Sequence, residues 1–157
     1  MSYDPDTAAT ISLAASRAEQ ILGAIHAHGG DLGPAYEALE EGITELEQAG
    51  HDVDEIVPAD SELSLGFWRV SDRSGKGFWA IYSRLVRRRI CSPDSALRGH
   101  VDHAMQASTG AIVGAVVTAL ALPLAAAAIA AGIAAILISI GIDAFCEMSE
   151  ESAEDVS

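Results

Sequence analysis

The sequence predicts a mainly α-helical protein with a small N-terminal helical domain and a C-terminal hydrophobic transmembrane segment, which is either a helical hairpin or one long kinked helix. Apolar residues recur at helical spacing near the N-terminus, half of the 157 residues are hydrophobic, and residues 110–142 form a run of 33 without a charge. The segments that we expect are an acidic helical pair at 1–50, a linker or short hairpin at 51–78, basic amphipathic helices at 79–103, the hydrophobic membrane segment at 104–145 and an acidic tail at 146–157.

Two amphipathic helices are expected at the N-terminus. Within residues 7–28, Ile11 and Ile25 belong to one apolar stripe, and two glycines follow that end the helix. A second helix should begin near Pro34, because the first helical position does not need the N–H that proline lacks, and run to residue 49. The short turn between them predicts an antiparallel pair. The glutamates of the second helix form either a solvated face or an acidic docking surface for a protein partner.

Charge is unevenly distributed along the chain. The net charge of -14 divides into -13 for residues 1–68, where Arg17 is the only base, +6 for residues 69–98 and -7 for residues 99–157. Binding to nucleic acid depends on Lys and Arg that neutralise phosphates, so this acidic chain is not expected to have a nucleic-acid partner.

The uncharged run is the strongest signal in the sequence. A helix needs about 20 apolar residues to cross about 30 Å of hydrocarbon, and so little other protein accompanies this run that we expect lipid to cover it. As one helix, 33 residues would extend about 50 Å, so we expect Pro123 either to kink a tilted helix or to form the tip of a hairpin with arms at 104–121 and 124–142. The residues that we predict to insert are Gly110, Gly114, Pro123, Ala130, Gly132, Ile136 and Ile140.

Small residues recur at a spacing of four in this run, for example Gly110 with Gly114 and Ala130 with Ala126 and Ala134. This spacing lets helix backbones approach closely in a membrane. It therefore predicts a homo-oligomer that forms through these faces.

Basic residues precede the apolar run. Cytoplasmic flanks of membrane helices are enriched in Lys and Arg, so we expect the protein at the cell membrane with its N-terminal domain in the cytoplasm. A membrane-surface site for anionic headgroups can form from four of these arginines and a nearby tryptophan: Trp79, Arg84, Arg87, Arg88 and Arg89. The alternative is a solvated arginine face over a small aromatic core.

The segment from Leu122-Pro123-Leu124 to Ile142-Asp143-Ala144-Phe145 is rich in Gly, Ala, Ile and Leu and closes on an acidic residue and an aromatic one. It resembles the hydrophobic hairpin of colicin-type pore-forming domains. In that family a soluble helical bundle hides the hairpin and then releases it into a bilayer. The resemblance covers about a quarter of the chain and implies that membrane insertion is conditional.

Catalytic and metal-binding patterns are weak. His100 and His103 can share one helix face, but zinc needs three or four ligands and no third partner is evident. Cys91 and Cys146 lack zinc-site spacing and are expected to be reduced. We therefore predict no enzyme, no cofactor and no metal site.

Our first hypothesis is a small membrane-anchored helical protein that oligomerises and perturbs or permeabilises the bilayer as a toxin or defence effector. The alternative is a non-catalytic soluble interaction protein whose apolar segment is buried in a homo-oligomer or in a partner.

Overall fold

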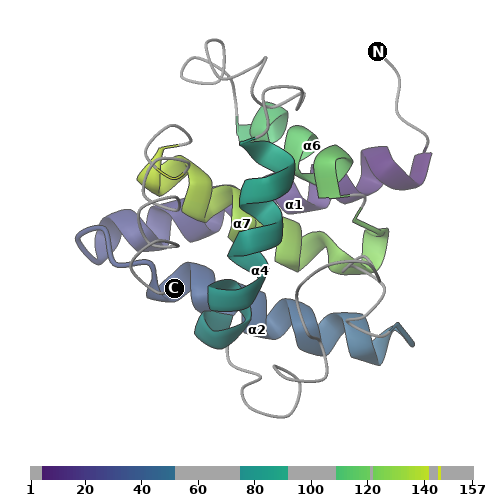
Figure 1. Cartoon of the computed structure of the whole chain (residues 1–157), viewed down its shortest axis with the longest axis horizontal. Helices are drawn as coiled ribbons and strands as arrows, with labels where there is room; N and C mark the ends of the chain where they lie inside the picture. The colour runs from purple at the N-terminus through teal and green to yellow at the C-terminus, as the bar shows by residue number, and fades with distance from the viewer. Residues whose placement is uncertain (1–4, 52–74, 92–108, 121, 142–144, 146–157) are drawn as a thin grey trace.

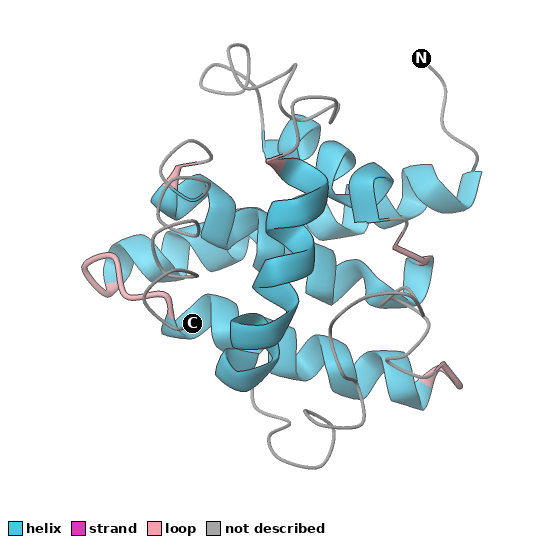
Figure 2. Cartoon of the chain, viewed as in Figure 1, coloured by secondary structure: helices cyan, strands magenta, loops and turns pink. Residues whose placement is uncertain are grey.

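The computed structural model describes residues 5–51, 75–91, 109–120, 122–141 and 145, and nearly all of this part is helical (Figure 2). It contains helices α1 (Pro5–Ala27), α2 (Gly33–Gln48), α4 (Gly75–Ile90), α6 (Thr109–Leu120) and α7 (Ala127–Ile140), with a 3-10 turn, η2 (Leu124–Ala126), before α7. No strand occurs among these residues. The prediction of a mainly α-helical protein is confirmed.

The most apolar helix, α7, lies at the centre of the bundle. It packs against α1, α2 and α6, and in Figure 1 it runs between α1 and α2. Every residue from 127 to 137 is buried. A helix that is apolar on all sides has to be covered on all sides, and here other helices of the same chain cover it. The expectation that the rest of the chain is too small to enclose the apolar run is therefore wrong.

The two N-terminal helices form the largest part of this cover. As predicted, α1 and α2 are joined by a glycine turn and run in opposite directions (Figure 1). Gly29 and Gly30 have φ values of 70° and 94°, a backbone region that glycine adopts without steric cost. Pro34 lies in the first turn of α2. The buried side chains recur at helical spacing and include Ala14, Ala18 and Ile25 on α1 and Leu39, Ile43 and Leu46 on α2.

Glycines allow α2 and α7 to approach closely. A Cβ atom added at Gly42 would lie 2.6 Å from Cγ1 and 2.9 Å from the backbone nitrogen of Ile129. On the other side of the contact, a Cβ at Gly132 would lie 2.8 Å from Cδ2 of Leu39 and 3.2 Å from the carbonyl oxygen of Ala35. The close approach of the two helices therefore depends on glycine, which has no side chain, at both positions.

The apolar run is a helical hairpin rather than one long helix. Pro123 is in an extended conformation, with φ of -77° and ψ of 168°, between the end of α6 and the start of η2. The two arms pack against each other. The helix of the first arm, α6, has 12 residues, and that of the second arm, α7, has 14. No helix in the described part of the chain is both long and apolar enough to cross a membrane.

Helix α4 begins earlier than the sequence suggested, at Gly75 instead of residue 79. It packs against α2 and α6, and a side chain at Gly75 would collide with the carbonyl oxygen of Tyr36 on α2. Phe78 and Tyr82 are buried, and their rings stack with centroids 4.8 Å apart. The expected linker at 52–74, the second basic helix at 92–103, residues 104–108 and the acidic tail at 146–157 lie outside the described residues.

The glycine contacts can be tested by adding one methyl group at a time. Gly42→Ala and Gly132→Ala should each lower the free energy of unfolding by about 1–3 kcal/mol, because the added carbon overpacks the α2–α7 crossing. Gly23→Ala is the matched control, since no atom lies within 4 Å of its added Cβ. This control should gain about 0.5–1 kcal/mol of stability, as expected for alanine in a helix. Urea unfolding followed by circular dichroism measures all three, and equal effects at the three glycines would contradict the close crossing.

Candidate membrane-active hairpin and its cover

The residues predicted to insert into a membrane lie in the α6–η2–α7 hairpin. Gly114, Ala130, Gly132 and Ile136 are buried, whereas Gly110, Pro123 and Ile140 are partly buried. The small-residue face predicted for oligomerisation is occupied within the chain, because Gly132 contacts Leu39 of α2. In this structure the hairpin is thus hidden by its own bundle.

The tip of the hairpin exposes a large apolar side chain. Leu124, the first residue of η2, has 43% of its surface exposed. The other large hydrophobic residue exposed in the described part of the chain is Leu13 on α1, at 55%. The turn that would have to lead an insertion therefore already presents an apolar side chain to the outside.

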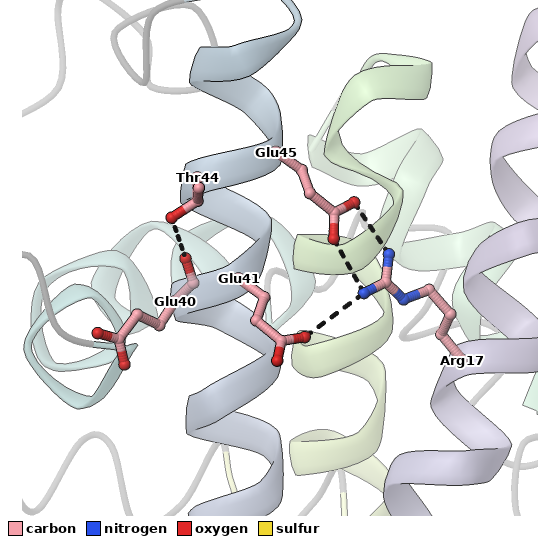
Figure 3. A network of polar contacts seen from close by, with 5 residues as sticks. All are labelled: Arg17, Glu40, Glu41, Thr44 and Glu45. Carbon is pink, nitrogen blue, oxygen red and sulfur yellow. Dashed lines mark hydrogen bonds and ion pairs between the residues drawn. The ribbon is translucent and has the colours of Figure 1, made fainter.

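An ion pair joins the two helices that cover α7. Arg17 of α1 donates hydrogen bonds of 3.0 and 3.1 Å from Nη1 and Nη2 to the two carboxylate oxygens of Glu45 on α2. A carboxylate oxygen of Glu41 lies 3.7 Å from Nη2. Figure 3 shows the Arg17 side chain reaching from α1 toward α2, with a further helix visible between them. The hydrogen bonds with Glu45 raise the pKa of Arg17, and the negative charges of Glu45 and Glu41 raise it further against the effect of burial.

This bidentate contact was missed by sequence reasoning. The available signal was that Arg17 is the only base among the first 68 residues, but its partner lies 28 positions away. Because both partners are partly exposed, the contact contributes about 1 kcal/mol or less to stability. It aligns α1 with α2 more than it holds them together.

The outer face of α2 is a shallow acidic groove. Its lining residues are Glu37, Glu40, Glu41, Thr44 and Glu45. The hydroxyl of Thr44 donates a hydrogen bond of 3.3 Å to the carbonyl oxygen of Glu40, so the threonine is directed along its own helix (Figure 3). The glutamates are exposed, as either a solvated face or a docking surface requires.

The predicted membrane-surface residues lie on α4 but do not form one uniform surface. Arg84, Arg88 and Arg89 are exposed and Arg87 is partly buried. Arginines in the last turns also suit the negative end of the helix dipole. Trp79 is partly buried, and its ring centroid lies 5.8 Å from that of Phe145 beyond α7. The tryptophan is therefore a packing contact of the hairpin in this structure, whereas the arginines face outward.

Tyr82 is the most strongly perturbed titratable side chain described. Its burial raises the pKa of the phenol well above the ordinary value, and the positive charge of Arg89 offsets only part of this increase. Tyr36, which is partly buried near Asp31, has a pKa raised by burial and then by the aspartate charge.

The cysteine prediction is wrong. Cys91, directly after α4, is disulfide-bonded rather than reduced. Its backbone N–H donates a hydrogen bond of 2.8 Å to the carbonyl oxygen of Arg87, which extends the helix by one residue. Cys146 lies outside the described residues.

Metal-binding groups do not come together in the part of the chain that the structure describes. No set of three His, Cys, Asp or Glu side chains there could hold an ion. His26 and His28 are exposed near the end of α1. His100 and His103 lie outside the described residues.

Comparison with known proteins adds no relationship to this geometry. No protein-family model matches the chain, and searches of curated proteins and of solved structures also find no match. A functional proposal for this protein therefore rests on the α6–η2–α7 hairpin, on α1 and α2 that cover it, and on the arginines of α4.

The contribution of the Arg17–Glu45 pair can be measured with a double-mutant cycle. Arg17→Gln and Glu45→Gln should each lower the free energy of unfolding by about 1 kcal/mol or less, and the double variant should lose little more than either single one. Urea unfolding at low and at high salt checks this, because salt screens the interaction. Fully additive losses would show that the two side chains do not interact in solution. Glu37→Gln, on the same helix face, is the control.

Burial of Tyr82 predicts loss of stability in alkali. Its folded-state pKa exceeds the unfolded value of about 10, so the stabilisation is fully present below that pH and is lost as the pH rises through the folded-state pKa. Above pH of about 10 the free energy of unfolding should fall by up to about 1.4 kcal/mol per pH unit. Tyr82→Phe should remove this slope, and Tyr36→Phe should remove less. Urea unfolding between pH of about 8 and about 11.5 tests the difference. An unchanged slope in Tyr82→Phe would contradict it.

Proposed function

We propose that this protein is a membrane-active helical effector that keeps its apolar hairpin inside its own bundle and releases it into a lipid bilayer. The observation that carries the proposal is the burial of α7, which is apolar on every side, beneath amphipathic helices that contact it through one stripe each. The local resemblance to the hairpin of colicin-type pore-forming domains is consistent with this role.

The energetics favour a conditional process. A bundle of this size is stable by only about 5–15 kcal/mol, so the closed state is separated from an open one by a modest difference. Leucine and isoleucine each favour the bilayer centre by about 0.3–0.6 kcal/mol, and alanine contributes little. The apolar hairpin therefore gains moderately from lipid, and further attraction is needed to open the cover.

Exposed arginines supply that attraction. Each basic side chain near an anionic membrane surface contributes about 1 kcal/mol, and α4 presents Arg84, Arg88 and Arg89 without any acidic residue in the helix. The proposed order of events is docking through α4, separation of α1 and α2 from α7, and insertion of the hairpin. The orientation with the N-terminal domain on the cytoplasmic side of the cell membrane stays a prediction from this basic flank.

Insertion requires rearrangement within the hairpin. The 14 residues of α7 span about 21 Å, which is shorter than the hydrocarbon layer. Residues 124–142 contain no charge, and as one helix these residues would extend about 28 Å. We propose that η2 joins α7 in the inserted form. Release also frees the small-residue face at Gly132 from Leu39, and this face then mediates oligomerisation in the bilayer.

The exposed leucines give a matched test with purified full-length protein and dye-filled vesicles of phosphatidylcholine with or without phosphatidylglycerol. The unaltered chain should release dye from the anionic vesicles. Leu124→Lys places a charge at the hairpin tip, which has to pass through the bilayer centre during insertion, where a lysine costs about 2.5–3.5 kcal/mol, so dye release should slow at least tenfold. Leu13→Lys alters another exposed leucine, outside the hairpin, and should release dye normally.

Urea unfolding should give similar midpoints for both lysine variants, because both leucines are exposed in the closed bundle. Equal dye release by the two variants would show that the hairpin tip does not enter lipid. A chain that neither binds nor permeabilises anionic vesicles would overturn the proposal and favour the second class, a non-catalytic interaction protein.

A further inference from the structure

Cys91 forms a disulfide, and the sequence limits which cysteine can be its partner. The chain contains two cysteines, so the one available partner within the same chain is Cys146. The residue before it, Phe145, is buried and contacts Trp79 of α4. Its N–H donates a hydrogen bond of 2.8 Å to the carbonyl oxygen of Gly141, the residue that follows α7. Phe145, the residue before Cys146, therefore packs on α4, the helix that Cys91 directly follows.

We infer that Cys91 and Cys146 of one chain form a disulfide that latches the outgoing end of the apolar hairpin to α4. The pairing stands by itself, whereas its role as a latch rests on the proposed release of the hairpin. The covalent loop closed by this bond contains all of α6, η2 and α7. The element proposed to enter the membrane is thus the element enclosed by the loop.

A cross-link of this kind favours the closed bundle. It restricts the chain in every open or unfolded conformation, and this restriction raises the free energy of those states relative to the folded one. The Trp79–Phe145 contact holds the same end of the hairpin non-covalently. Once the disulfide is broken, that aromatic contact and the packing of the helices are left to hold the end of α7.

Opening of the latch is a thiol–disulfide exchange with a dithiol reductant. One thiolate of the reductant attacks a cysteine sulfur, the S–S bond breaks, and a mixed disulfide forms. The second thiol of the reductant then displaces the remaining cysteine. The two cysteines gain two electrons and two protons, and the reductant becomes a disulfide. An oxidising compartment keeps the latch closed, and a reducing thiol pool opens it.

The pairing is tested by peptide mass mapping of the full-length protein, digested without reductant after alkylation of free thiols. The expected result is one cross-linked species that joins the Cys91 peptide to the Cys146 peptide and comes from a monomer on a non-reducing gel. Alkylated cysteines, or a cross-link confined to a dimer band, would overturn the inference.

The latch is tested with the anionic dye-filled vesicles. Protein reduced with dithiothreitol should unfold at lower urea concentration and release dye at least tenfold faster than oxidised protein. Cys91→Ser with Cys146→Ser should behave as reduced protein with or without dithiothreitol, which controls for effects of the reductant on the vesicles. Equal rates for the oxidised and reduced forms would overturn the latch while leaving the proposed function in place. No release by either form would overturn both.

Discussion

The structure depends on one constraint, which is that a helix without a polar face has to be kept from water on every side. All residues of α7 from 127 to 137 are buried, and the other helices are arranged to achieve this. The apolar stripes of α1 and α2 face α7, and α6, which precedes the turn at Pro123, packs beside it. Gly132 in α7 and Gly42 in α2 let these two helices approach closely.

The same constraint has two physical solutions, because protein and lipid can both exclude water from an apolar helix. The bundle uses the first solution, but its cover is thin, since each amphipathic helix contributes one stripe to the interior and a solvated face to the outside. The bidentate contact between Arg17 and Glu45 aligns the two covering helices at a partly exposed site. The proposed release of α7 into a membrane would require this cover to separate.

Helix α4 packs in the bundle and also carries the arginines that we propose to contact lipid. Its buried aromatic residues, Phe78 and Tyr82, belong to the bundle, whereas Arg84 and Arg88 face outward with a charge opposite to that of most of the chain. Cys91 directly follows the helix, and its disulfide introduces a covalent element into an otherwise non-covalent assembly. A single helix thus combines packing, the proposed contact with anionic lipid and the proposed latch, so these properties would change together if α4 were displaced.

The sequence by itself determined the helices, the apolar stripes that include Ile25 and Ile43, and the break in the apolar run at Pro123. These features follow from residues a few positions apart, because helix periodicity and the restricted backbone of proline act locally. Only the tertiary structure decided that α7 is enclosed by its own chain, that Arg17 meets Glu45, that Gly42 lies on Ile129 and that Cys91 is oxidised. Each of these contacts joins distant segments, and local spacing carries no information about which of several possible covers, protein or lipid, reaches an apolar surface.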